Sequence, residues 1–159
     1  MNKNLKTTIR QAEYNDVPEI VRLLAEDDLG KRREHFTSPL PQAYYAAFKE
    51  ISADKNNWLM VAETEGKIVG TLQITFIPYL TYQGGQRALI EAVRIDKAFR
   101  GQGIGKLMIE WAIAKAKEKN CCLIQLTTDK SRQDALIFYT KLGFIASHEG
   151  LKLHLTASS

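Results

Sequence analysis

A short stretch near the middle of the chain carries three alternating glycines between two basic residues. It reads Phe99, Arg100, Gly101, Gln102, Gly103, Ile104, Gly105 and Lys106, and it precedes a strongly amphipathic segment. Glycine adopts positive φ at little steric cost and lets another molecule approach the main chain. Amide N–H groups at a helix start are unpaired and carry partial positive charge, so this pattern suits an anion such as a phosphate.

The glycine spacing excludes two well-known phosphate loops. A P-loop needs glycine at the position of Arg100 and Ser or Thr at the position of Leu107, and a dinucleotide fingerprint needs glycine at the position of Lys106. A glycine-rich turn that only lets a helix pack tightly on a strand remains an alternative.

Two further segments accompany the loop. Val93, Arg94, Ile95 and Asp96 precede it, and residues 135–144 follow with the pattern A-x-x-F-Y-x-K-x-G-F. With the loop's own pattern, R-x-x-G-x-G, these segments resemble the GNAT superfamily of acyl-CoA-dependent N-acetyltransferases, and the resemblance covers nearly the whole chain. One position departs from it, because Arg132 stands where many members place asparagine.

The resemblance implies acetyl-CoA as the co-substrate and loop amides that hold the diphosphate of coenzyme A. No metal is expected, because neither Cys121 nor Cys122 has a Cys or His partner at metal-ligand spacing. The resemblance implies a coenzyme site formed by Val93, Arg94, Ile95, Arg100, Gly101, Gln102, Gly103, Ile104, Gly105, Lys106 and Arg132. The backbone groups of Val93 and Ile95 would meet the pantetheine arm. An N–H of the same strand, that of Val93, would donate to the thioester carbonyl oxygen.

Glu91 is the candidate general base, acting directly or through water. Regular strand alternation places Leu89, Glu91, Val93 and Ile95 on one face, and a carboxylate among apolar side chains is either paired or functional. An alkylammonium titrates near ~10.4, so a base must help to deprotonate the attacking amine. The alternative is a bulge that turns Glu91 to solvent, or pairing with Arg87.

Tyr139 is the candidate acid, since the resemblance places a tyrosine of this segment near the thioester sulfur. Its helical spacing with Ala135, Phe138 and Leu142 fits an ordinary core aromatic equally well. Two aromatic residues are candidates for the substrate pocket. Phe36 follows a mixed-charge loop that lines the acceptor side in the family, and Tyr79 precedes the central strand, where it would line the pocket or a dimer contact.

The periodicities predict an α/β fold. Strands are expected at residues 7–12, 58–64, 68–77, 87–96, 123–127 and 151–155, helices at 105–119 and 131–142 and from Asp16 and Gln42, and a loop at 26–41. A helix between strands 87–96 and 123–127 predicts that these strands are parallel. The resemblance implies a GNAT-like mixed sheet, mostly antiparallel with a central parallel pair, flanked by helices.

Composition narrows the class of protein. With 159 residues, of which 45% are hydrophobic and 25% charged, the chain suits a single domain over residues 1–159 with a core at about 7–155. It has no apolar run long enough to span a membrane, and Met1 to Lys6 does not resemble a secretory signal, so a cytoplasmic protein is expected. The net charge of +4 suits an anionic ligand. A basic helix or stacked aromatics typical of nucleic-acid binding are missing from the sequence.

The sequence therefore predicts an N-acetyltransferase that acts on a small-molecule or peptide amine by direct attack. A non-catalytic acyl-CoA-binding regulatory module is the alternative. The identity of the amine, the acyl-chain length and the choice between monomer and homodimer stay open.

Overall fold

The computed structural model describes residues 6–156; residues 1–5, which hold most of the basic N-terminal tail, and residues 157–159 lie outside the described part. The strands are β1 (Thr7–Gln11), β2 (Asn57–Thr64), β3 (Lys67–Pro78), β4 (Gln86–Ile95) and β5 (Leu123–Leu126). The helices are α1 (Val17–Ala25), α2 (Asp28–Arg33), α3 (Gln42–Ala53), α5 (Ile104–Glu118) and α6 (Gln133–Lys141). The short elements are η1 (Tyr14–Asp16), η2 (Lys97–Phe99) and the four-residue turn α4 (Thr81–Gly84).

The five strands form one mixed sheet in the order β1-β2-β3-β4-β5. Neighbouring strands are antiparallel except β4 and β5, which are parallel and are joined through α5. The two-residue turn between β2 and β3 places Glu65 and Gly66 at φ 51° and 75°, as tight hairpins require. The predicted hairpin, parallel pair and mixed sheet are confirmed, although the parallel pair lies at one edge of the sheet and not at its centre.

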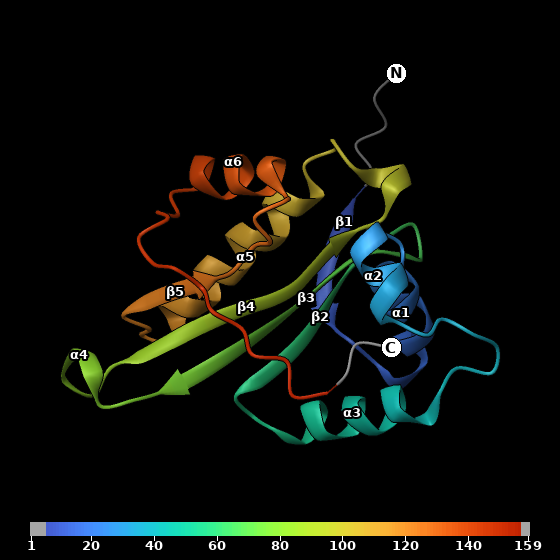
Figure 1. Cartoon of the computed structure of the whole chain (residues 1–159), viewed down its shortest axis with the longest axis horizontal. Helices are drawn as coiled ribbons and strands as arrows, with labels where there is room; N and C mark the ends of the chain where they lie inside the picture. The colour runs from blue at the N-terminus through green and yellow to red at the C-terminus, as the bar shows by residue number, and fades with distance from the viewer. Residues whose placement is uncertain (1–5, 157–159) are drawn as a thin grey trace.

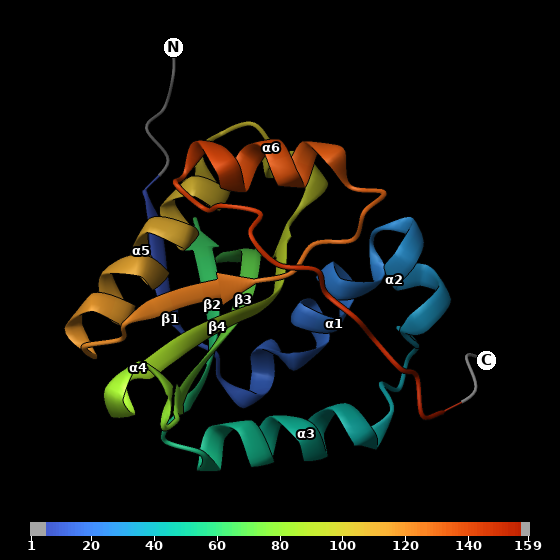
Figure 2. The same cartoon turned by 60° about the vertical axis from the view of Figure 1, so that its left-hand side comes forward.

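Helices cover both faces of the sheet (Figures 1 and 2). The predicted amphipathic helix, α5, buries Met108, Ile109 and Ala112 against Leu72 and Phe76 of β3. On the opposite face, Val17, Ile20 and Val21 of α1 are buried, and Phe48 of α3 packs beside them. The sheet therefore separates an α5–α6 side from an α1–α3 side, and a residue of β4 faces one or the other.

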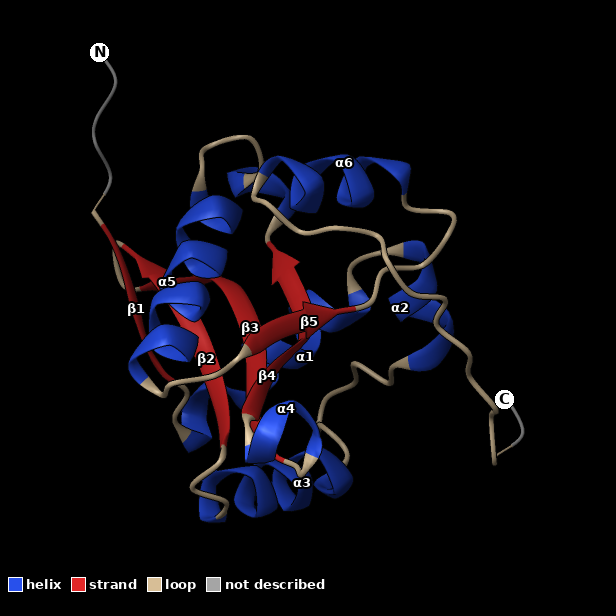
Figure 3. Cartoon of the chain, turned by 90° about the vertical axis from the view of Figure 1, so that its left-hand side faces the viewer, coloured by secondary structure: helices blue, strands red, loops and turns tan. Residues whose placement is uncertain are grey.

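Two expected segments differ from the structure. The expected loop at 26–41 contains α2, because Asp27 caps its start by accepting the Gly30 amide at 2.6 Å and basic residues end it. Residues 151–155, expected as a strand, pair with no strand of the described chain and form an extended segment that passes the end of β5 (Figure 3). Alternation predicts which side chains share a face, but it does not supply a neighbouring strand.

No helix within residues 6–156 has the length and apolar character needed to cross a membrane.

Candidate active site

The glycine loop has an unusual backbone at two of its three glycines. Gly101 and Gly103 have φ +75° and +82°, and a Cβ added to either would meet no atom within 4 Å. Gly103 is the N-cap of α5, and Leu107 is the first residue whose amide closes a helical bond, to the Gly103 carbonyl at 3.0 Å. Within the described chain, no side chain accepts a hydrogen bond from the amides of residues 101 to 106. The loop thus presents open backbone donors at a helix start, which is a site for an anion.

The third glycine has a packing role. A Cβ on Gly105 would lie 3.5 Å from Cζ of Phe138 and 3.7 Å from Cγ1 of Ile95. The Phe138 ring of α6 and the end of β4 therefore both pack against the first turn of α5. The side chain of Ile104 is only 5% exposed, and its contribution to a ligand is limited to its amide. Glycine at position 105 therefore allows tight packing of the helix on the strand, as the alternative interpretation predicted. Glycine at positions 101 and 103 instead allows a backbone with positive φ.

The basic side chains of the loop are bound loosely. Arg100 donates from Nε to the Ile95 carbonyl at 3.1 Å and lies 3.5 Å from Glu26 through Nη2. Lys106 is 3.7 Å from Glu110. Their side chains are 50% and 61% exposed, so both remain accessible to an incoming anion.

A β-bulge at Ala92 changes the expected facing of β4. Thr71 pairs with Arg94 and Gln73 with Glu91, so Ala92 and Val93 together oppose Leu72, and Ala92 has φ 52°. Val93 and Ile95 pack against the α5-side core. Glu91 and Arg94 instead share the α1–α3 face with their partners Gln73 and Thr71.

The expectation that Glu91 shares an apolar face with Val93 and Ile95 is therefore wrong. Glu91 is exposed, as the bulge alternative anticipated, and it is not hydrogen-bonded to Arg87 in the described chain. The bulge inserts one residue and thereby reverses the alternation beyond it.

The same part of β4 has an open edge. β5 pairs with β4 only from Arg87 to Ile90, and beyond Ile90 the strands separate. The backbone of residues 91–95 therefore has no strand of the described chain on that side. This gap leads from Glu91 to the glycine loop, and an extended ligand could bond to the strand as a further strand would.

Tyr139 lies on the α6 side of the gap. Its ring packs at 5.1 Å from Phe138 and 5.8 Å from Phe144, centre to centre. Burial raises the pKa of its hydroxyl, and the nearby Arg94 and Arg132 partly offset that rise. The hydroxyl therefore keeps its proton at neutral pH, as a proton donor must.

Arg94 is a buried cation with unused hydrogen-bonding capacity. Its side chain is 14% exposed, and Nη1 donates to the Val93 carbonyl at 2.8 Å. Nε is buried without a hydrogen bond, although Oδ2 of Asp27 lies 3.5 Å away. Burial lowers the pKa of Arg94, and the nearby Arg33 lowers it further. The guanidinium thus shares its carboxylate partner, Asp27, with Arg132.

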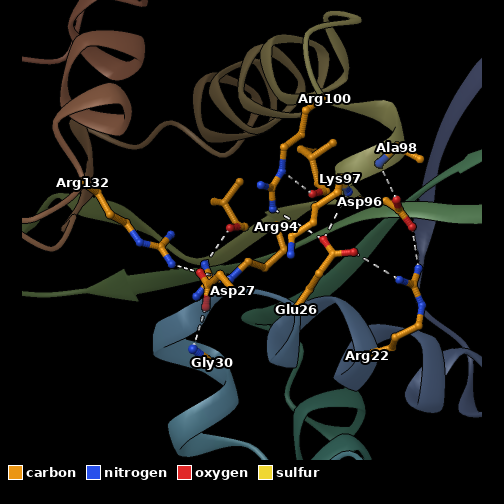
Figure 4. A network of polar contacts seen from close by, with 12 residues as sticks. Arg22, Glu26, Asp27, Gly30, Arg94, Asp96, Lys97, Ala98, Arg100 and Arg132 are labelled. Atoms are coloured by element: carbon orange, nitrogen blue, oxygen red, sulfur yellow. Dashed lines mark hydrogen bonds and ion pairs between the residues drawn. The ribbon is translucent and has the colours of Figure 1, made fainter.

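Arg132 reaches across from the start of α6 to α1 and α2. Its Nη2 is ion-paired with Asp27, which also faces Arg94 and caps α2 (Figure 4). Glu26 beside it contacts Arg22, Arg100 and the Lys97 amide. Both acids lie in the segment 26–41 that the sequence predicts as a loop, although an Asp followed by a basic helix end is the signal for a capped helix.

The two aromatic substrate candidates lie apart. Phe36 is 49% exposed in the segment after α2, on the α1–α3 side. Tyr79 lies at the other end of β4 from the glycine loop. The guanidinium carbon of Arg87 is 4.7 Å from the centre of the Tyr79 ring, and the Tyr79 hydroxyl oxygen is 3.4 Å from Sγ of Cys122. The Cys122 hydrogen bond raises the pKa of Tyr79 to about 12. The structure does not bring Tyr79 to the gap end of β4.

An apolar pocket of about 160 Å³ lies on the α1–α3 side of the bulge. It is lined by α1 and α3 side chains together with Leu59, Thr71, Gln73 and Ala92. A larger hollow of about 350 Å³ lies near Asp96 and the β2–β3 turn, at the opposite end of α1 from Asp27, and its lining includes none of the residues of the gap. The smaller pocket is therefore the one that adjoins the site.

A helix start with open amides beside an open strand edge defines a site for an extended ligand that carries a diphosphate-type anion, as coenzyme A does. The family model described as the acetyltransferase (GNAT) family matches residues 19–144. The chain belongs to the GNAT acetyltransferase family and is an acetyl-CoA-dependent acyltransferase.

Three known proteins illustrate the similarity. Glucosamine 6-phosphate N-acetyltransferase of Trypanosoma brucei brucei is 30% identical over 142 residues, which cover 85% of this chain and 95% of that protein. A crystal structure described as a transcriptional regulator from Bacillus halodurans C-125 is 59% identical, with TM-score 0.92, covering 94% of this chain and 100% of that one. A predicted acetyltransferase with acetyl-CoA from Clostridium acetobutylicum is 25% identical, with TM-score 0.72, covering 94% and 97%.

Proposed function

We propose that the chain transfers an acetyl group from acetyl-CoA to the primary amine of a small molecule that also carries an anionic group. The observation that carries this proposal is the open edge of β4, with Tyr139 on its α6 side and Glu91 and Arg94 on its α1–α3 face. The two substrates then approach the gap from opposite sides of the sheet.

The coenzyme is held by the main chain of the loop and of β4. The amides of residues 101 to 106 bind the diphosphate, with Arg100 and Lys106 adding charge. The backbone of Val93 and Ile95 bonds the pantetheine arm along the strand edge. Arg132 turns from Asp27 toward the coenzyme when that ligand is bound.

Glu91 takes the proton of the ammonium, directly or through one water molecule, and the neutral nitrogen attacks the thioester carbonyl. The new C–N bond places negative charge on the oxygen, and the Val93 amide stabilises it. The C–S bond then breaks. The Tyr139 hydroxyl donates a proton to the departing thiolate and regains one, through water, from the newly acylated nitrogen. The proton on Glu91 returns to water.

Arg94 selects the acceptor. It lies on the same face as Glu91, it shares its carboxylate partner Asp27 with Arg132, and it keeps a buried Nε without a hydrogen bond. A phosphate, phosphonate or carboxylate would supply both the charge and the acceptor oxygens. The Trypanosoma relative, named for an amine that carries a phosphate, supports the same class.

The test combines coenzyme binding with matched amine pairs. Calorimetry with acetyl-CoA should show binding, and thiol release should be faster with glucosamine 6-phosphate than glucosamine, and with 2-aminoethylphosphonate than ethanolamine. Arg94→Gln should remove the preference within each pair while leaving coenzyme binding in place. Binding without turnover on any amine refutes the transferase, whereas turnover with equal rates within pairs refutes only the acceptor class.

The similarity to a transcriptional regulator from Bacillus halodurans favours one second candidate, a regulatory module that binds acyl-CoA without transferring it. Acetyl-CoA binding that survives Glu91→Gln and Tyr139→Phe, with no turnover by the native chain on amines or peptides, would identify this function.

A further inference from the structure

The pocket on the α1–α3 side of the bulge has mostly apolar walls, which come from α1, α3 and the sheet. Its lining side chains with polar atoms, Tyr44, Thr71 and Gln73, direct those atoms to protein partners. The Tyr44 hydroxyl donates to Glu34 at 3.0 Å, and the Thr71 hydroxyl donates to a main-chain carbonyl of β2 at 3.0 Å. The Gln73 amide nitrogen donates to Asn57 at 2.8 Å. A polar group would lose its water here for little return, so the pocket favours an apolar group.

The volume of the pocket sets the size of that group. A cavity of ~150 Å³ with Leu, Ile and Phe walls is large enough to hold benzene. The pocket, at about 160 Å³, therefore suits a group of roughly four to six carbon atoms, such as an isobutyl group or a phenyl ring. Ala47 of α3 lines the pocket and is exposed, so the pocket is open to solvent and a ligand can enter it.

The pocket adjoins the two charged residues of β4 that serve the acceptor. Its lining residue Gln73 pairs across the sheet with Glu91, and its lining residue Thr71 pairs with Arg94. Residues directly opposite on antiparallel strands have Cβ atoms about 4.5–5.5 Å apart. Ala92, the bulge residue next to Glu91, is itself part of the pocket wall. The carboxylate, the guanidinium and the apolar pocket are therefore neighbours on one face of the sheet, within reach of a single small molecule.

We propose that the acceptor is a free α-amino acid with an apolar side chain of about the size of leucine or phenylalanine. This inference rests on the proposed function and narrows its acceptor class. The amino group lies at Glu91, the carboxylate bonds to Arg94 and the side chain fills the pocket. An α-amino acid carries these three groups on one carbon atom, which matches three neighbouring subsites. An acyl chain would extend from the thioester on the Tyr139 side of the gap, so the geometry favours the acceptor side chain as the occupant.

Calorimetry in the presence of coenzyme A measures the affinity for glycine, leucine and phenylalanine. The two larger amino acids share the amine and carboxylate of glycine and should bind at least about tenfold more tightly, because they also fill the pocket. Ala47→Leu fills the pocket from α3 and should remove that advantage. Ala46→Leu is the matched control, since Ala46 is an exposed neighbour on α3 that does not line the pocket, and the advantage should remain. Melting temperatures check that both variants are folded.

Thiol release from acetyl-CoA with the same amino acids tests the transfer separately. Equal affinities for glycine and leucine, or a preference that Ala47→Leu leaves unchanged, would overturn the pocket assignment even if amines are acetylated. Preferential binding of leucine without turnover would refute the transferase and support the pocket as an amino acid site. Tighter binding of butyryl-CoA than of acetyl-CoA, abolished by Ala47→Leu, would assign the pocket to an acyl chain and overturn the proposal.

Discussion

Glu91 and Arg94 lie on the same face of β4 although they are three positions apart in the sequence. In a regular strand they would face opposite sides, and the bulge at Ala92 supplies the extra residue that brings them together. The pair places a carboxylate and a buried guanidinium on the α1–α3 side, opposite Tyr139. Several expected outcomes depend on this arrangement.

Glu91→Gln is expected to lower kcat by about 10²–10⁴-fold, because the amide cannot take the ammonium proton. The affinity for acetyl-CoA should not change, since Glu91 faces away from the loop. Thiol release and calorimetry measure the two quantities. Glu50→Gln, the same change on the exposed surface of α3, is the control and should leave both unchanged. A Glu91→Gln variant with native kcat would remove the base assignment.

Tyr139→Phe is expected to lower kcat while preserving the melting temperature, because the ring contacts with Phe138 and Phe144 remain. Burial raises the pKa of Tyr139 above its ordinary value of 10.0, so the native hydroxyl stays protonated through the alkaline range where amines lose their proton. A pH profile should therefore show no loss of native kcat from this group below about pH 10. An alkaline loss centred well below that value would contradict the role.

Gly103→Ala is expected to weaken acetyl-CoA binding, because a Cβ at φ +82° strains the turn that presents the loop amides. The free energy of unfolding should fall by roughly 1–2 kcal/mol. Gly66→Ala is the control, since Gly66 has φ +75° with equally open surroundings in the β2–β3 turn. It should lose similar stability with native KM for acetyl-CoA. Equal KM values in both variants would argue against diphosphate binding at the loop.

Asp16→Asn is expected to lower the free energy of unfolding near neutral pH by about 1–2 kcal/mol. Burial acts to raise the pKa of Asp16, but hydrogen bonds from Arg10 and the Glu13 amide outweigh it and hold the pKa below 3.8. A depressed folded pKa stabilises the fold above the unfolded value, and this contribution is lost as pH falls below about 3.8.

The difference between native and Asp16→Asn melting temperatures should therefore shrink as the solution is acidified from neutral to about pH 3. Asp28→Asn should show no difference at any pH, because Asp28 is 95% exposed in its pair with Lys31. A difference for Asp16→Asn that persists at the acid end would mean that packing, and not charge, is responsible.

Local patterns were reliable where neighbouring residues decide the conformation. The three alternating glycines predicted a special backbone, and positive φ at Gly101 and Gly103 confirms it. The amphipathic stretch predicted α5, which buries Met108 and Ala112. Such features depend on residue types and spacing over a few positions, which the chain carries directly.

Local sequence patterns did not predict contacts between segments that are far apart in the sequence. Simple alternation put Glu91 among apolar residues, and a bulge at Ala92, whose existence depends on pairing with β3, reversed that facing. Arg132 and Asp27 form an ion pair, but no pattern in the sequence links the two segments that contain them. The alternation at residues 151–155 likewise did not show that no strand of the described chain pairs with them.

The order of residues alone determined the glycine loop, the helix that follows it, the parallel pair and the family resemblance, because each rests on short-range geometry and periodicity. Only the tertiary structure decided which face Glu91 and Arg94 share, where β4 and β5 separate, and which acids meet the arginines. Those outcomes follow from strand register and packing, and one inserted residue in a strand is enough to exchange its two faces.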